Sequence, residues 1–83
     1  MKVRAEVSLY PLRTSELSRP VEAFCQALSR KGLQVQMGSM STLVEGECGD
    51  VFDAVRDAFW EAARRHQVAI RFAVTNAGMA ETD

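Results

Sequence analysis

The sequence contains few of the residues on which most catalytic and metal sites are built. It has one histidine, His66, and two cysteines, Cys25 and Cys48, that lie far apart in the chain. Zinc sites need several cysteine or histidine ligands at close spacing, and disulfide frameworks need several cysteine pairs. The sequence therefore predicts neither a metal site nor a disulfide framework. No Ser-His-Asp or Cys-His catalytic set can be assembled convincingly, because the histidine falls at the end of a predicted helix.

The chain also lacks an excess of either charge and any long apolar run. Ten basic and eleven acidic residues leave a net charge of -1, which argues against a nucleic-acid binder with a basic face. No segment approaches the roughly 18 apolar residues that span a bilayer, and the N-terminus carries charges where a signal peptide is apolar. Hydrophobic residues are 47% and charged residues 25%, which is typical of one folded domain spanning residues 1–83. We expect a cytoplasmic protein that binds neither nucleic acid nor membranes.

Four segments show the period-two alternation of β-strands. They are residues 3–10, 33–37, 40–47 and 68–75. Pro11 has no donor for the strand ladder and is expected to end the first strand. Gly38-Ser39 fits a two-residue hairpin turn between the second and third strands. This turn would pair Val35 with Thr42 and would point Thr42 toward the helices.

Two further segments carry the apolar stripe of helices packed on one side. The first helix is expected to begin with Ser18 as its cap, with Pro20 in its first turn, and to stop before Gly32. The second is expected to begin with Asp50 as its cap. The first stripe comprises Leu17, Val21, Phe24, Cys25 and Leu28, and the second comprises Val51, Val55, Ala58, Phe59, Ala62 and His66.

The order β-α-β-β-α-β predicts a ferredoxin-like α+β fold, with a four-stranded antiparallel sheet in the order 4-1-3-2 and two helices on one face. The other face of the sheet, called the open face below, is mixed in character. It displays Arg4, Glu6, Ser8, Tyr10, Gln34, Gln36, Ser41, Leu43, Glu45, Glu47, Ala69, Arg71, Ala73 and Thr75. Such a surface contacts solvent, a second copy of the chain or a small ligand.

Two carboxylates on the open face, Glu6 and Glu45, lie on adjacent predicted strands. A pair of carboxylates is one arrangement for acid–base chemistry. Arg4 and Arg71 are close enough in the predicted sheet to neutralise them, for example through a cross-strand pair of Glu6 with Arg71. Balanced charge on a structural surface is therefore the favoured interpretation, and the sequence shows no catalyst.

Three segments resemble the YkoF-type family that binds thiamine and hydroxymethylpyrimidine. They are residues 5–12 (AEVSLYPL), 40–47 (MSTLVEGE) and 50–55 (DVFDAV), and together the likeness covers most of residues 3–74. The ending Glu45-Gly46-Glu47 is also similar to related single-domain thiamine-binding-like proteins. YkoF-type chains carry two such units, so the resemblance implies that a homodimer or homotetramer of this chain would complete a site between subunits.

The resemblance implies a non-catalytic protein that binds thiamine or its hydroxymethylpyrimidine moiety in transport, salvage or sensing, and that needs no cofactor. The implied ligand-binding residues are Glu6, Ser8, Tyr10, Ser41, Thr42 and Glu45. Hydroxyls and carboxylates match the donors and acceptors of an aminopyrimidine, and a carboxylate or an aromatic ring attracts the thiazolium cation. Thr42 fits least well, because the predicted pairing turns it toward the helices. Either it lies in a pocket between sheet and helix, or the register is shifted by one residue.

Two other functions fit the same fold. A small dimeric isomerase or cofactor-free oxygenase would need a buried histidine or a carboxylate with a raised pKa in an apolar pocket. A purely structural or regulatory subunit would show a flat sheet interface with no pocket. Trp60 lies beside the second apolar stripe, where it would either pack or close a ligand pocket.

Overall fold

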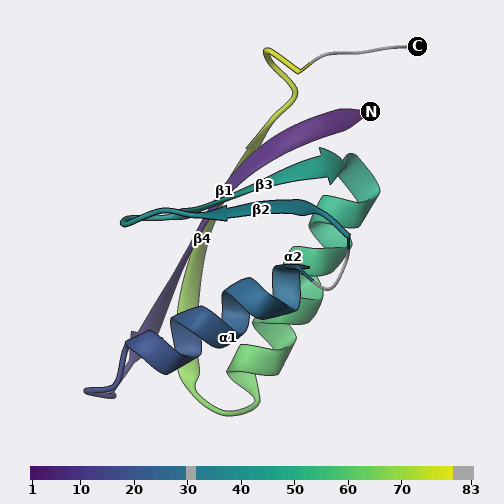
Figure 1. Ribbon diagram of the computed structural model, residues 1–83. Coiled ribbons are helices and arrows are strands. Elements are labelled where there is room, and N and C mark those ends of the chain that lie inside the picture. The colour runs from purple at the N-terminus through teal and green to yellow at the C-terminus, as the bar shows by residue number, and fades with distance from the viewer. Residues whose placement is uncertain (30–31, 80–83) are drawn as a thin grey trace.

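The computed structural model describes residues 1–29 and 32–79 and has the element order β-α-β-β-α-β (Figure 1). The elements are β1 (Lys2–Leu12), α1 (Ser18–Ser29), β2 (Gln34–Met37), β3 (Thr42–Glu47), α2 (Cys48–Ala63) and β4 (Gln67–Thr75). The strands lie in the order β2-β3-β1-β4, and each neighbouring pair is antiparallel. This confirms the predicted ferredoxin-like fold. Lys31, which precedes the predicted glycine stop, and the end of the C-terminal tail at 80–83 lie outside the described residues.

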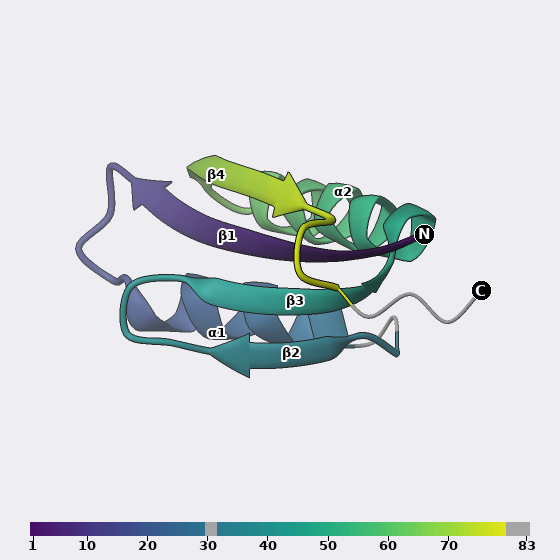
Figure 2. The same cartoon turned by 90° about the horizontal axis from the view of Figure 1, so that it is seen from above.

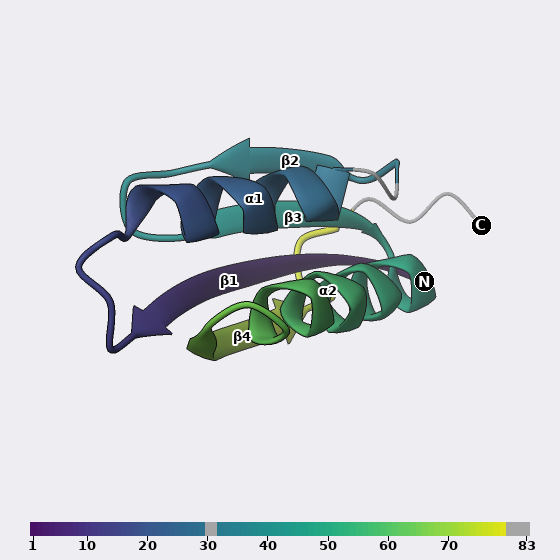
Figure 3. The same cartoon turned by 90° about the horizontal axis from the view of Figure 1, so that it is seen from below.

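Both helices cover the same face of the sheet, α1 toward the β2 edge and α2 toward the β4 edge (Figures 2 and 3). The core fills the space between these layers. Its buried members are Val3, Ala5, Val7, Leu9, Phe24, Leu28, Val44, Val51, Ala54, Val55 and Ala58. Alternate residues of β1 supply the sheet side, as the period of two predicts. Among the described residues, no helix is long and apolar enough to cross a membrane.

The two apolar stripes are shorter than predicted. Leu28 is fully buried, but Leu17 is 55% exposed because α1 begins only at Ser18. His66 is exposed, since α2 ends at Ala63 and the chain has turned toward β4. Leu17 and His66 therefore lie outside the helices whose stripes were expected to include them.

Helix α2 begins two residues earlier than Asp50. Its first residue is Cys48, and Glu47 is the N-cap without a side-chain capping bond. The Cys48 backbone N–H donates to the Met1 carbonyl at 2.8 Å, so the helix start is held to the first residue of the chain. Asp50 lies in the first turn, where its charge favours the positive end of the helix dipole.

The β2–β3 connection is a four-residue loop over residues 38–41 rather than the predicted two-residue turn. The Gly38 N–H donates to the Ser41 carbonyl at 2.9 Å and closes the loop. Val35 pairs with Val44 instead of with Thr42, a shift of two residues from the prediction. Because side chains alternate with a period of two, this shift leaves every residue on its predicted face.

Strand β1 continues through Pro11 to Leu12, two residues beyond the predicted last residue, Tyr10. β3 pairs with β1 only from Lys2 to Val7, whereas β4 pairs with it from Arg4 to Leu12. The last part of β1 therefore has a single strand neighbour, which is the context in which a proline is tolerated in a sheet. This part of β1 carries the outward residues that follow Glu6 along the open face.

Gly46 on β3 packs closely against the side chain of Leu33. A Cβ atom added there would overlap the Leu33 Cδ2 atom and would also approach Val51. We expect Gly46→Ala to lower the free energy of unfolding by about 1–3 kcal/mol, the usual cost of forcing a packed side chain aside. Urea denaturation measures it. Gly49→Ala, in the first turn of α2 with open space around it, is the control and should be neutral or slightly stabilising. Equal stability of both variants would contradict the packing argument.

Candidate functional site

A hollow of about 250 Å³ lies on the open face beside the β2–β3 loop. Its lining residues are Glu6, Gln36, Gly38, Ser39, Met40, Ser41 and Leu43. Glu6, Leu43 and Gln36 lie opposite one another on β1, β3 and β2, so they form one row across three strands. Since residues paired in this way project from the same face, the row makes the floor of the hollow and the loop makes its wall. We call this feature the hairpin hollow.

Two hydrogen bonds attach the loop to β1. The Ser41 hydroxyl donates to Glu6 Oε2 at 3.0 Å, and the Ser8 hydroxyl donates to the Met40 carbonyl at 3.3 Å. Glu6 has no ion pair with any described residue; the pair with Arg71 considered from the sequence does not form, since Arg71 lies opposite Ser8. An ionised carboxylate has about four acceptor positions, so Glu6 keeps acceptor capacity after binding Ser41.

Glu45 lies two residues along β3 from Leu43 and does not line the hairpin hollow. Its partner is Arg4, directly opposite on β1, whose Nε donates to Glu45 Oε2 at 2.8 Å. The carboxylate is thus already matched by a cation. The structure therefore gives Glu6 and Glu45 different environments.

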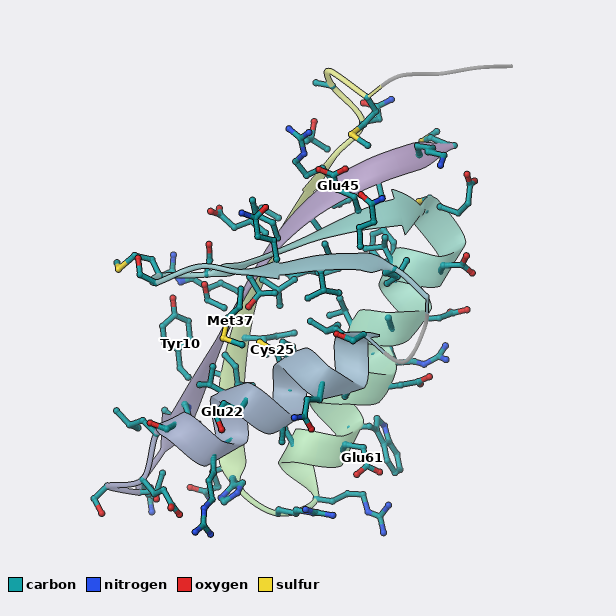
Figure 4. All side chains as sticks on the ribbon, viewed as in Figure 1. Tyr10, Glu22, Cys25, Met37, Glu45 and Glu61 are labelled. Carbon is teal, nitrogen blue, oxygen red and sulfur yellow. The ribbon has the colours of Figure 1, made fainter. Side chains whose placement is uncertain are left out.

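Tyr10 and Glu45 lie on opposite sides of the hairpin hollow. Tyr10 is on the part of β1 that extends past β3 (Figure 4). Its ring is exposed, and Ala69 lies opposite it on β4. Tyr10 and Glu45 lie well apart in Figure 4, so these two predicted ligand residues do not belong to one compact site. Of the six predicted residues, the structure brings together Glu6, Ser8 and Ser41.

Thr42 points to the opposite side of the sheet. It is 5% exposed, and its hydroxyl lies 3.2 Å from the Sγ of Cys25, which α1 presents to the sheet (Figure 4). The expectation that Thr42 turns toward the helices is confirmed, but its partner is a protein thiol. Trp60 is exposed on α2, in the helix layer, and is not part of the hollow.

We expect Thr42→Val to leave ligand affinity within about twofold of the wild type. Valine keeps the buried volume and removes a hydroxyl whose partner is only a weak hydrogen-bonding group, so the free energy of unfolding should fall by about 1 kcal/mol or less. Titration calorimetry and urea denaturation measure the two effects, and Ser41→Ala, one residue away on the other face, is the matched variant. A loss of affinity as large as that of Ser41→Ala would show that Thr42 reaches the ligand.

Sequence analysis did not single out Gln36, Leu43 and the loop residues Gly38–Met40 as site residues, although they complete the hollow. Their position depends on the strand register and on the four-residue loop. The sequence does indicate that Gln36 and Leu43 lie on the same face of the sheet as Glu6, because side chains alternate along β2 and β3. That alternation could have suggested them as site residues.

Comparison with solved structures establishes the class of fold. A hypothetical protein from Methanocaldococcus jannascii has a TM-score of 0.87 and 24% identity, covering 96% of this chain and 84% of that chain. A candidate thiamine biosynthesis/salvage protein from Thermotoga maritima has a TM-score of 0.84 and 19% identity, covering 98% and 90%. A domain of unknown function from Bacillus cereus has a TM-score of 0.81 and 19% identity, covering 100% and 83%. The likeness defines a ferredoxin-like domain that spans nearly all of this chain.

The family follows from the sequence match. The sequence model of the thiamine-binding protein family matches residues 5–75, so this chain belongs to that family. The match confirms the resemblance found in the three sequence segments. No curated protein matches the sequence.

Proposed function

We propose that the protein binds thiamine, or its hydroxymethylpyrimidine moiety, at the hairpin hollow without transforming it, in transport, salvage or sensing. Membership of the thiamine-binding protein family supports a ligand of this kind. The observation that carries the proposal is Glu6, a carboxylate that faces the hollow, accepts a hydrogen bond from Ser41 and has no cation among the described residues. Both the amino group of the pyrimidine and the thiazolium cation are suitable partners for it.

The other lining groups suit the same ligand. The Gln36 amide both donates and accepts hydrogen bonds, as the ring nitrogens and amino group of the pyrimidine require. Leu43 provides an apolar floor for a flat ring. Tyr10, farther along β1, offers an aromatic face that would attract the thiazolium cation.

The proposal includes a homodimer or homotetramer. The hairpin hollow is open and its 250 Å³ is below the roughly 300–1,000 Å³ of typical ligand pockets, so a second copy over the open face would enclose the ligand. The edge strand β4 offers another contact, since beside it Phe52 is 46% exposed while packing edge-on against Phe72. Analytical ultracentrifugation with and without ligand tests the assembly, and a monomer under both conditions would overturn this part of the proposal.

Titration calorimetry with thiamine and with hydroxymethylpyrimidine tests the function. We expect binding of at least one of them, weakened by Ser41→Ala, because this change removes the hydroxyl that holds the loop and Glu6 together. The thermal midpoint of Ser41→Ala should change little, since that hydrogen bond is exposed. No heat of binding with either compound at millimolar concentration would overturn the proposal. Turnover of the bound compound, followed by chromatography, would instead support an enzyme.

A further inference from the structure

Arg71 on the open face has no acidic partner among the described residues. Arg4 is paired with Glu45, and Glu47 with the N-terminal ammonium group. Arg71 on β4 is exposed, and no residue in 1–29 or 32–79 forms a hydrogen bond or ion pair with its side chain. Glu6 and Arg71 are thus opposite charges on the open face that both lack an ionic partner among the described residues.

Arg71 is next to the hairpin hollow and forms no ion pair with Glu6. It lies opposite Ser8, and Glu6 lies opposite Ala73, so Arg71 and Glu6 are diagonal neighbours across β1 and β4. Diagonal neighbours of this kind are about 7–8 Å apart, which long side chains can span toward a shared ligand. The two charges thus flank the hydroxyl of Ser8 on one continuous surface.

The surroundings of Arg71 leave its guanidinium accessible from the open face. The outward residues before and after it on β4 are Ala69 and Ala73, and both are small and exposed. Tyr10, the other diagonal neighbour of Arg71, carries a hydroxyl that can donate a hydrogen bond. An arginine beside hydroxyl donors is a common partner for a phosphate group, because the planar guanidinium binds two oxygens at once.

We propose that the site recognises a phosphate monoester of its ligand and that Arg71 binds the phosphate. This inference rests on the proposed function and specifies the form of the ligand. Thiamine monophosphate carries a cationic ring and, on a short hydroxyethyl arm, a dianionic group, so it would match Glu6 and Arg71 together. Free thiamine would leave Arg71 without a partner and would bring a second cation close to it.

Titration calorimetry of the full chain at low ionic strength, with thiamine and with thiamine monophosphate, tests this inference. We expect the monophosphate to bind roughly tenfold more tightly than thiamine, the lower end of what a charged hydrogen bond contributes. Arg71→Gln should abolish this difference, and Arg71→Lys should restore part of it. Arg65→Gln is the matched control, since Arg65 is an exposed arginine on the helix side and its loss changes the net charge equally.

The possible outcomes distinguish a failure of the Arg71 inference from a failure of the proposed function. Binding of thiamine without any gain from the phosphate, or a gain that persists in Arg71→Gln, would overturn the role of Arg71 and leave the proposed function in place. Inorganic phosphate that binds as tightly as the monophosphate would indicate an isolated anion site and would also overturn it. If neither thiamine, thiamine monophosphate nor hydroxymethylpyrimidine binds, both the proposed function and this inference are overturned.

Discussion

Glu6→Gln is expected to lower the affinity for thiamine by about 10- to 100-fold. The change removes a negative charge that faces the hairpin hollow, and hydrogen bonds to charged groups contribute about 1.5–3 kcal/mol. Glutamine keeps an oxygen that can accept the Ser41 hydrogen bond, so the loop should stay attached and the thermal midpoint should hardly change. Titration calorimetry and thermal denaturation measure the two effects on one sample.

The ligand series shows which part of thiamine Glu6 contacts. A loss confined to thiamine, with hydroxymethylpyrimidine unaffected, would place the carboxylate beside the thiazolium cation. A similar loss for both would place it at the pyrimidine amino group.

Glu22→Gln provides the matched control for Glu6→Gln. Glu22 is exposed on α1 in the helix layer, away from the open face, and its substitution changes the net charge by the same amount (Figure 4). Its affinity for thiamine should remain within about twofold of the wild type, because exposed charges beyond a Debye length are largely screened. Equal losses in both variants would mean that Glu6 acts only through the overall charge, and an unchanged Glu6→Gln affinity would remove it from the site.

Leu28→Ala is expected to be strongly destabilising. Leu28 is fully buried, in contact with the core between α1 and the sheet, and truncation of a buried leucine costs about 2–5 kcal/mol. A domain of 83 residues has a total stability of about 4–12 kcal/mol, so the variant loses a large share of it. The midpoint of thermal unfolding should fall by about 10–30 °C, as followed by circular dichroism.

The control is Leu17→Ala, which makes the same chemical change at the other end of the predicted stripe. Leu17 precedes α1 and is 55% exposed, so its truncation should cost about 0.5 kcal/mol or less. A similar midpoint shift in both variants would mean that Leu17 is covered in solution, for example by a second copy of the chain. Only the structure separates these two leucines, since the sequence assigns them to one stripe.

The predictions that succeeded depend on local periodicity. The alternation in β1 places Val3, Ala5 and Val7 in the core and Glu6 and Ser8 on the open face, whatever the neighbouring strands are. The helix stripes and the order of elements then leave the ferredoxin-like sheet as the arrangement that covers one face. Thr42 follows the same rule, and its side of the sheet was predictable although its Cys25 partner was not.

The predictions that failed concern lengths and pairings. A two-residue turn at Gly38-Ser39 and the observed four-residue loop place the same side chains on the same faces, so the alternation alone cannot distinguish them. The start of α2 was misplaced for a related reason. β3 runs directly into Cys48, and the Met1 carbonyl, distant in sequence, accepts the bond of its backbone N–H.

By itself, the sequence determined the fold and the two faces of the sheet, because both depend on the local periodicity of strands and helices. It also determined the membership of the thiamine-binding protein family, whose sequence model matches residues 5–75. Only the tertiary structure decided which polar residues share a site. The register joins Glu6, Leu43 and Gln36 in one row, the loop adds Ser41, and Arg4 matches Glu45. Register and loop length are set by contacts between segments far apart in the chain, so a hollow that depends on them becomes visible only in the folded molecule.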